Sequence, residues 1–317
     1  MTLNSTQCIC PKDIYIGCEV VKFIKALTLS LGDINKPVIT RYQLGLIIHS
    51  LYQAKEYKGE SIGVQKDAAD SRDFGKYLKL LLDEGLLAQP RGMPGSTYTL
   101  LGNTRWEVED VVCTLDPFCY ISHLSAMAYH GLTDRIPSKL FISSPGVKDW
   151  KVFAIERMKK DLKEDYTIYR DNSLPALSHP IIKKVGKKEV HCTHSKHLGA
   201  YKNVRDRNIR VATIGRTFLE MLRSPALCGG INHVLEIFDM HAEKYLRLIT
   251  DEFDSNGNNM DKVRAGYIVE ERLGIKNETV ESWTAFAQRG GSRKLDASAE
   301  YYPQWSDKWC LSLNVFE

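Results

Sequence analysis

The segment from Asp67 to Gly102 constrains the fold of this chain more than any other, because its apolar pattern changes period in a definite order. From Phe74 to Leu82 apolar residues recur at helical spacing, and Gly85 is suited to end a helix. Two short runs follow, LLAQP at 86–90 and STYTLL at 96–101, on either side of the turn sequence RGMPG. The segment therefore predicts a helix followed by a β-hairpin.

Two further helical patterns precede this segment. Residues 18–31 place apolar side chains at helical spacing, and Thr40 is a good N-cap for a second helix that runs to about Ala54. Three helices followed by a small hairpin predict a winged helix-turn-helix domain over residues 1–105. The polar segment from Tyr52 to Asp70 is longer than a compact helix-turn-helix needs.

In a winged helix-turn-helix the third helix enters the major groove of DNA. The side chains expected to meet DNA lie opposite its apolar stripe, shortly before it or at the hairpin tip, and they are Lys66, Ser71, Arg72, Lys76, Lys79 and Arg91. Arg and Lys can bind guanine edges or phosphates, and Ser can bind a phosphate. The alternative is a polar helix face and a solvated turn. The order of three helices, a helix end at Gly85 and a hairpin favours DNA binding.

The chain has 317 residues, of which 43% are hydrophobic and 26% charged, and a chain of this length is expected to form two domains. Its charges are distributed unevenly along the sequence. Residues 146–223 carry 18 basic and 9 acidic side chains, although the whole chain has a net charge of only +4. A second basic surface is predicted from Lys183, Lys184, Lys187, Lys188, Lys196, Lys202, Arg205, Arg207 and Arg210. Such a surface fits a polyanion or an acidic protein, and the alternative is a solvated lysine-rich face.

Two arginines extend this basic set. Arg216 and Arg223 are seven positions apart in a predicted helix and therefore share one face of it. They are expected to contact DNA or a protein partner, or else to be solvated or paired with Glu220.

Four blocks in the second part of the chain carry a family resemblance. They are SAMAYHGLTDRIP at 125–137, RTFLEMLRSPALCGGI at 216–231, AGYIVEERLGI at 265–275 and DKWCLSLN at 307–314. In this order they resemble the AbiEi family, the antitoxins of abortive-infection type IV toxin-antitoxin systems. The resemblance implies an α+β chain in which residues 106–317 form an AbiEi-like antitoxin domain of helices on a small sheet.

The same resemblance implies the function and the partners. The protein would bind double-stranded operator DNA to repress its own operon, and it would counteract a companion nucleotidyltransferase-like toxin in phage defence. Direct contact with the toxin and the oligomeric state are left open. A stand-alone winged-helix transcription regulator is the first alternative, and a DNA-acting enzyme is the second.

Motifs for catalysis and for cofactors are absent from the sequence. It contains no G-x-x-x-x-G-K-[ST], G-x-G-x-x-G, G-x-S-x-G or H-E-x-x-H motif, so neither a catalytic residue nor a cofactor is expected. The cluster HCTHSKH at 191–197 and the cysteines at positions 8, 10 and 18 lack zinc-site spacing. The acidic segment 252–263 ends on Val263, where a calcium loop needs Glu. We expect no metal and no enzymatic activity.

Composition also bears on localisation. No apolar run approaches the roughly 18 residues that a membrane span needs, and residues 1–10 lack the layout of a signal peptide. The eight cysteines are scattered, as is usual in a reducing compartment. A cytoplasmic protein without a membrane partner is therefore expected.

Overall fold

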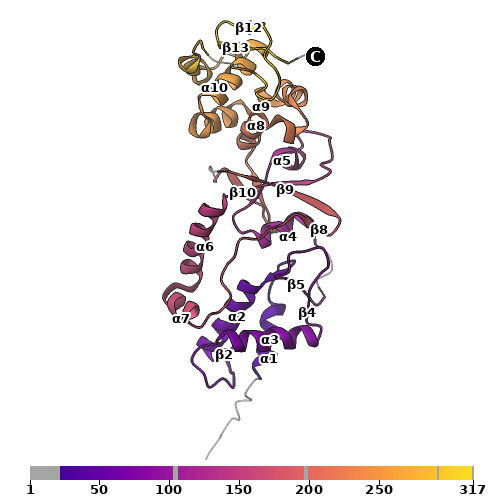
Figure 1. Ribbon diagram of the computed structural model, residues 1–317, viewed down its shortest axis with the longest axis vertical. Helices are drawn as coiled ribbons and strands as arrows, with labels where there is room; N and C mark the ends of the chain where they lie inside the picture. Colours follow the sequence, from indigo (N-terminus) through magenta and orange to yellow (C-terminus); the bar gives the residue numbers. More distant parts are fainter. Residues whose placement is uncertain (1–21, 103–105, 196–198, 291–292, 316–317) are drawn as a thin grey trace, which may run out of the picture.

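The structure is a computed structural model that describes residues 22–102, 106–195, 199–290 and 293–315. Helices and several small sheets alternate along it, so the predicted α+β class is confirmed. The molecule is elongated, with the first helices at one end and the C-terminal helices at the other (Figure 1). Within the described ranges, no helix is long and apolar enough to cross a bilayer.

The first part of the chain contains the elements expected from its pattern. They are α1 (Phe23–Gly32), α2 (Arg41–Ala54), α3 (Ser71–Asp83), β4 (Leu87–Ala88) and β5 (Thr97–Leu100). The predicted cap of α2 is confirmed, because the Gln43 backbone N–H donates to Thr40 Oγ1 at 3.2 Å. The part of the first predicted helix before residue 22 lies outside the described residues.

Two features of this part were not predicted. A short strand, β1 (Ile39–Thr40), pairs with β5 and gives an antiparallel sheet of order β1-β5-β4. The long polar segment before α3 contains a small hairpin of β2 (Glu56–Tyr57) and β3 (Glu60–Ser61). This hairpin accounts for the extra length between the second and third helices.

A helical arm from later in the sequence completes the core of this part. The arm consists of α6 (Val147–Leu162), the turn η1 (Lys163–Asp165) and α7 (Tyr166–Asp171), and it lies alongside α2 (Figure 1). Its Met158, Leu162 and Tyr169 belong to the same buried cluster as side chains from α1, α2 and α3. Gly45 permits the contact, since a Cβ there would lie 2.4 Å from the Tyr169 hydroxyl. A domain boundary at residue 105 stays a prediction.

A six-stranded mixed sheet forms the middle of the molecule, with the order β10-β11-β6-β7-β9-β8. Its strands are β6 (Tyr120–Ile121), β7 (Leu140–Ser144), β8 (Lys184–Val185), β9 (Lys188–His194), β10 (Tyr201–Asn203) and β11 (Arg210–Ala212). Side chains from α4 (Val108–Leu115) and α5 (His123–Tyr129) share its buried cluster. Helix α5 has its C-cap at His130 and is followed by Gly131, which has a φ of +65°.

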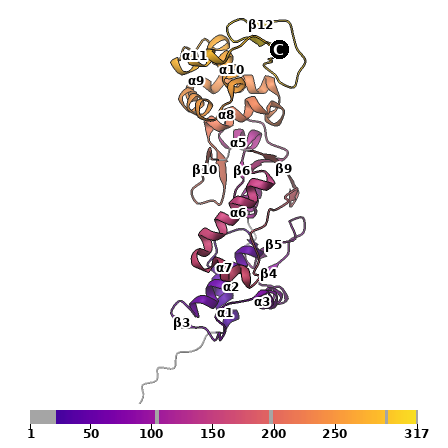
Figure 2. The ribbon, with the colours of Figure 1, turned by 60° about the vertical axis from the view of Figure 1, so that its left-hand side comes forward.

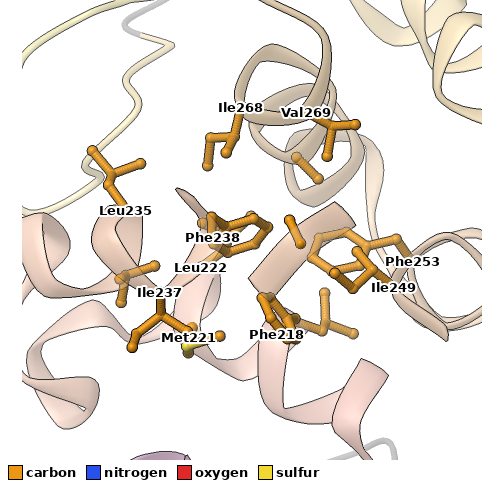
Figure 3. Close-up of a cluster of buried hydrophobic side chains, with 14 of the residues drawn as sticks. Phe218, Met221, Leu222, Leu235, Ile237, Phe238, Ile249, Phe253, Ile268 and Val269 are labelled. Carbon is orange, nitrogen blue, oxygen red and sulfur yellow. The ribbon is translucent and has the colours of Figure 1, made fainter. Parts of the chain in front are cut away.

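The C-terminal part is helical. It contains α8 (Ile214–Arg223), η2 (Pro225–Cys228), α9 (Ile231–Asn256), α10 (Asn259–Gly266), the π-helix η3 (Tyr267–Arg272), α11 (Glu278–Ser282), η4 (Trp283–Phe286) and the hairpin β12 (Trp305–Ser306) with β13 (Leu311–Ser312). Figure 3 shows its core, in which Phe218 of α8 meets Phe238 and Phe253 of α9. Helix α9 continues to Asn256 and α10 begins at Asn259, so the acidic segment 252–263 is almost entirely helical.

A buried ionic network links this helical part to the sheet. The Arg216 side chain is only 3% exposed, and its Nε donates to Glu220 Oε1 at 3.2 Å while Nη1 lies 3.4 Å from Glu252 Oε1. Glu220 also accepts the Tyr120 hydroxyl at 2.7 Å and the His123 backbone N–H at 3.2 Å. The network therefore contains groups from β6, α5, α8 and α9.

His123 sits in this network with unusual backbone geometry. Its φ of +50° lies in the left-handed region, and its side chain contacts the Ser122 hydroxyl at 2.8 Å. Burial is the main cause that lowers the pKa of His123 below its ordinary value of 6.5, and nearby His191 and Arg216 act in the same direction while Glu220 opposes them. The folded state therefore holds the ring neutral at a pH where the unfolded chain begins to bind a proton.

Substituting Arg216 tests whether the network stabilises the fold. Arg216→Leu leaves buried Glu220 without its cation, and we expect a loss of about 3–5 kcal/mol in the free energy of unfolding, measured in urea. The control is Arg247→Leu, since Arg247 is 92% exposed and 3.8 Å from Asp251, so we expect a loss below about 1 kcal/mol. Equal losses in the two variants would contradict a structural role for Arg216.

His123 predicts a pH dependence of stability. Above pH 6.5 the His123 ring is neutral in both the folded and the unfolded state, so its contribution to the free energy of unfolding is fully present. As the pH falls from 6.5 toward the lowered pKa of the folded state, the unfolded state binds a proton and the free energy of unfolding declines. His123→Asn keeps a residue type that tolerates positive φ and removes this titration. Urea unfolding between pH 7 and 5 should show a slope that is smaller than wild type by up to about 1.4 kcal/mol per pH unit. An unchanged slope would contradict the assignment.

Candidate nucleic-acid interface

Helix α3 presents the predicted polar face to solvent. Its N-cap is Asp70, whose Oδ1 accepts the backbone N–H groups of Arg72 at 2.8 Å and Asp73 at 3.0 Å. Phe74, Leu78 and Leu81 are buried on one side. The predicted contact residues Ser71, Arg72, Lys76 and Lys79 are all exposed. The capped start at Ser71 thus fixes which side chains face outward.

Lys66 lies at the start of α3 but is bound by acidic neighbours. Its Nζ is 2.8 Å from Asp73 Oδ2 and 3.3 Å from Asp70 Oδ2. The hydrogen bond to Asp73 is the main cause that raises the pKa of Lys66. Its positive charge is thus shared with the cap of α3, whereas Arg72, Lys76 and Lys79 make no ion pair within the described part of the chain.

Sequence analysis missed one cation beside α3. Arg41 is exposed at the first position of α2, and its guanidinium lies 5.0 Å from the centre of the Phe74 ring. This contact places a positive charge next to the first turn of α3. The available signal was its position directly after the N-cap Thr40, because the N-terminus of a helix attracts phosphate.

The hairpin tip brings two predicted basic regions together. Arg91 is exposed, and Gly92 next to it has a φ of +76°. A Cβ at Gly92 would lie 3.5 Å from the Gly186 carbonyl oxygen, so the tip contacts the turn between β8 and β9. Arg91 and Lys187 therefore each lie next in the chain to a residue of this contact, although they are far apart in sequence.

The turn between β8 and β9 adds exposed lysines at this contact. Lys183, Lys184 and Lys187 are exposed and make no ion pair with any described residue. Lys188 is half-buried and donates to the Pro137 carbonyl. We call Arg91, Lys183, Lys184 and Lys187 the wing–turn cluster. These four cations lie at or beside the tip of the hairpin of β4 and β5, where they can bind phosphates.

The remaining basic residues do not form one continuous surface, which corrects the predicted set. Lys202 and Arg205 are exposed near the hairpin of β10 and β11. Arg207 is held by Asp110 at 2.6 Å. The Arg210 guanidinium donates to the backbone carbonyls of Cys113, Asp116 and Cys119, so it supports the turn after α4. Lys196 lies outside the described residues.

The two arginines of α8 are also structural. Arg216 is buried in the network with Glu220 and Glu252, so its predicted place on an exposed surface is wrong. Arg223 is 24% exposed and pairs with Asp261 at 2.7 Å. The predicted alternative, that such residues pair with acidic side chains, holds for Arg216 and Glu220. Both guanidinium groups are paired with carboxylates of the same chain, so they are not available to bind a partner.

No metal centre is visible in the described ranges. There, no group of three or more His, Cys, Asp or Glu side chains is placed to bind an ion. His191 and His194 lie on β9, where an odd spacing turns them to opposite faces. The residues at positions 8, 10, 18 and 197 lie outside the described part of the chain.

Similarity to known proteins is found among solved structures. No family model and no curated protein matches the chain. Among solved structures, the chain is similar to the crystal structure of the Rv2827c protein from Mycobacterium tuberculosis, with 13% sequence identity and a TM-score of 0.43 over 90% of this chain and 89% of that chain. The likeness is too distant to support an argument about function.

Proposed function

We propose that the chain binds operator DNA through an N-terminal winged helix-turn-helix and acts as an AbiEi-like antitoxin that represses its own operon. The observation that carries the DNA-binding part is the exposed face of α3, with Arg72, Lys76 and Lys79 free of ion pairs in the described ranges. The arrangement of α1, α2, α3 and the three-stranded sheet supports it. In such a domain the third helix occupies the major groove.

Each group of cations has a separate part in the proposed complex. Arg72, Lys76 and Lys79 project from α3 toward base edges, where Arg and Lys bind guanine O6 and N7. Arg41 binds the phosphate backbone at the start of α2. The wing–turn cluster binds backbone phosphates beside the groove and fixes the register of the protein on the duplex.

The exposed cations also determine the salt dependence of binding. Each phosphate neutralised by Lys or Arg releases condensed counterions, and the logarithm of affinity falls with the logarithm of salt by about 0.9 per contact. Arg210, Arg216 and Arg223 contribute nothing to this slope, because they are committed to carbonyl or carboxylate groups. The slope therefore reports the exposed set alone.

The antitoxin part of the proposal depends on the resemblance of the second half to the AbiEi family. In this part of the proposal, the C-terminal half counteracts a companion nucleotidyltransferase-like toxin, with or without direct contact. A stand-alone regulator would share the DNA-binding face but would have no toxin to counteract. Co-expression with the adjacent gene separates these two possibilities, since a growth defect caused by that gene alone and relieved by this chain supports the antitoxin.

A triple substitution on α3 tests the DNA-binding face. Arg72→Ala with Lys76→Ala and Lys79→Ala should weaken binding to the chain's own upstream DNA by at least about a hundredfold, because each lost base or phosphate contact costs about 1 kcal/mol or more. The measurement is a gel-shift titration with unrelated DNA as competitor, at several salt concentrations. The salt slope should also become smaller in the triple variant.

The matched control removes the same charge at the far end of the molecule. Lys244→Ala with Arg247→Ala and Lys276→Ala changes three exposed cations of the C-terminal part and should leave operator affinity near that of wild type (Figure 1). The α3 variant should still relieve toxicity in co-expression. Wild-type operator affinity in the α3 variant would show that α3 is not the recognition helix.

A further inference from the structure

A cavity of about 670 Å³ lies outside the proposed DNA-binding face. It opens where the hairpin of β10 and β11 meets the end of α5, the first turn of α8 and the second half of α9. Pockets that bind small organic ligands typically have volumes of about 300–1,000 Å³. The size of the cavity is therefore that of a small-molecule site.

One end of the cavity is cationic. Lys202 and Arg205 line it, are exposed, and make no ion pair with any described residue. Burial lowers the pKa of His130 beside them and so favours its neutral ring, although the hydrogen bond from Nε2–H to the Ala212 carbonyl at 2.7 Å opposes this shift. The first turn of α8 also lines the cavity, and its backbone N–H dipoles strengthen the positive potential.

The α9 wall of the cavity offers hydrogen-bond acceptors. Leu248, Asp251, Glu252 and Ser255 share one face of α9, since their spacing follows the helical repeat. Glu252 is engaged by Arg216 and by Asn256. Among the residues that the structure describes, the Asp251 carboxylate has one long contact of 3.8 Å with Arg247, and the two side chains are 69% and 92% exposed. Asp251 can therefore accept hydrogen bonds from a ligand.

The cavity is also lined by apolar side chains. Leu248 and Tyr129 line the cavity and are each 47% exposed, and Ile214 lines it from α8. Large apolar side chains with half their surface exposed beside a cavity can cover a flat ring. A ligand that satisfies all three regions has an anionic group, hydroxyl donors and a flat apolar body.

We propose that this cavity binds a free nucleotide. Lys202 and Arg205 hold its phosphates, Asp251 accepts the ribose hydroxyls, and the base packs against Tyr129, Ile214 and Leu248. A cationic ligand is repelled by Lys202 and Arg205. The site is separate from the proposed operator contact, so failure of operator binding would leave this inference intact.

Isothermal titration of the full chain with ATP and with GTP tests the proposal. At least one of them should bind saturably with one site per chain, while adenosine, guanosine and inorganic triphosphate should each bind about tenfold more weakly or worse, since each lacks part of the interactions. Arg205→Ala and Lys202→Ala should each weaken nucleotide binding by about tenfold. Lys244→Ala, an exposed lysine of α9 outside the cavity, should leave it unchanged.

The role of Asp251 has its own test. The 2′,3′-dideoxy form of the nucleotide that binds should bind wild type about tenfold more weakly, and Asp251→Asn should not weaken it further. Three results would overturn the proposal. The first is no saturable binding at millimolar nucleotide, and the second is equal affinity for inorganic triphosphate and nucleotide. The third is a loss of nucleotide affinity in the double variant Lys184→Ala with Lys187→Ala that matches the loss in Arg205→Ala. The last would place the phosphates on the wing–turn cluster.

Discussion

The buried guanidinium of Arg216 determines how the C-terminal helices join the sheet. An arginine withdrawn from water needs anions and hydrogen-bond acceptors in fixed positions, and here Glu220 and Glu252 supply them. Gly215 makes this possible, because a Cβ there would lie 2.2 Å from the Leu248 carbonyl oxygen, so α8 and α9 approach closely. Tyr120 then ties Glu220 to β6. The ionic network thus fixes the relative position of the sheet and helices together with the apolar contacts that Met127 and Leu132 make in the core of α8 and α9.

The sequence predicted those parts of the fold whose signals are local. The cap of α2 and the hairpin after Gly85 are set by residues within a few positions of each element, and the structure contains both. The arm of α6 and α7 was not predicted, because its place depends on contacts such as that between Gly45 and Tyr169, which are distant in sequence. The order of the six strands has the same long-range origin.

The basic residues of the second half show why sites are harder to predict than elements. In the sequence, Arg216 and Lys184 are equally plausible surface cations, yet one is 3% exposed in its side chain and the other lies open on a turn. Charge alone does not distinguish them, since the distinction depends on which acidic groups the fold brings near. The exposed face of α3 was predictable because the helical period itself separates Phe74 and Leu78 from Lys76. The cavity beside α9 was not, as it is assembled from separate elements.

The helical arm limits how this protein can change during evolution by recombination. The arm lies beside the first helices in both views of the ribbon (Figure 2). The backbone N–H of Ser71 donates to the Asn172 carbonyl at 3.1 Å, so a residue after α7 holds the first turn of α3. A gene exchange that replaced residues 22–102 alone would place a foreign surface against Met158 and Tyr169. Lineages of this fold are therefore expected to inherit the first part and the arm together.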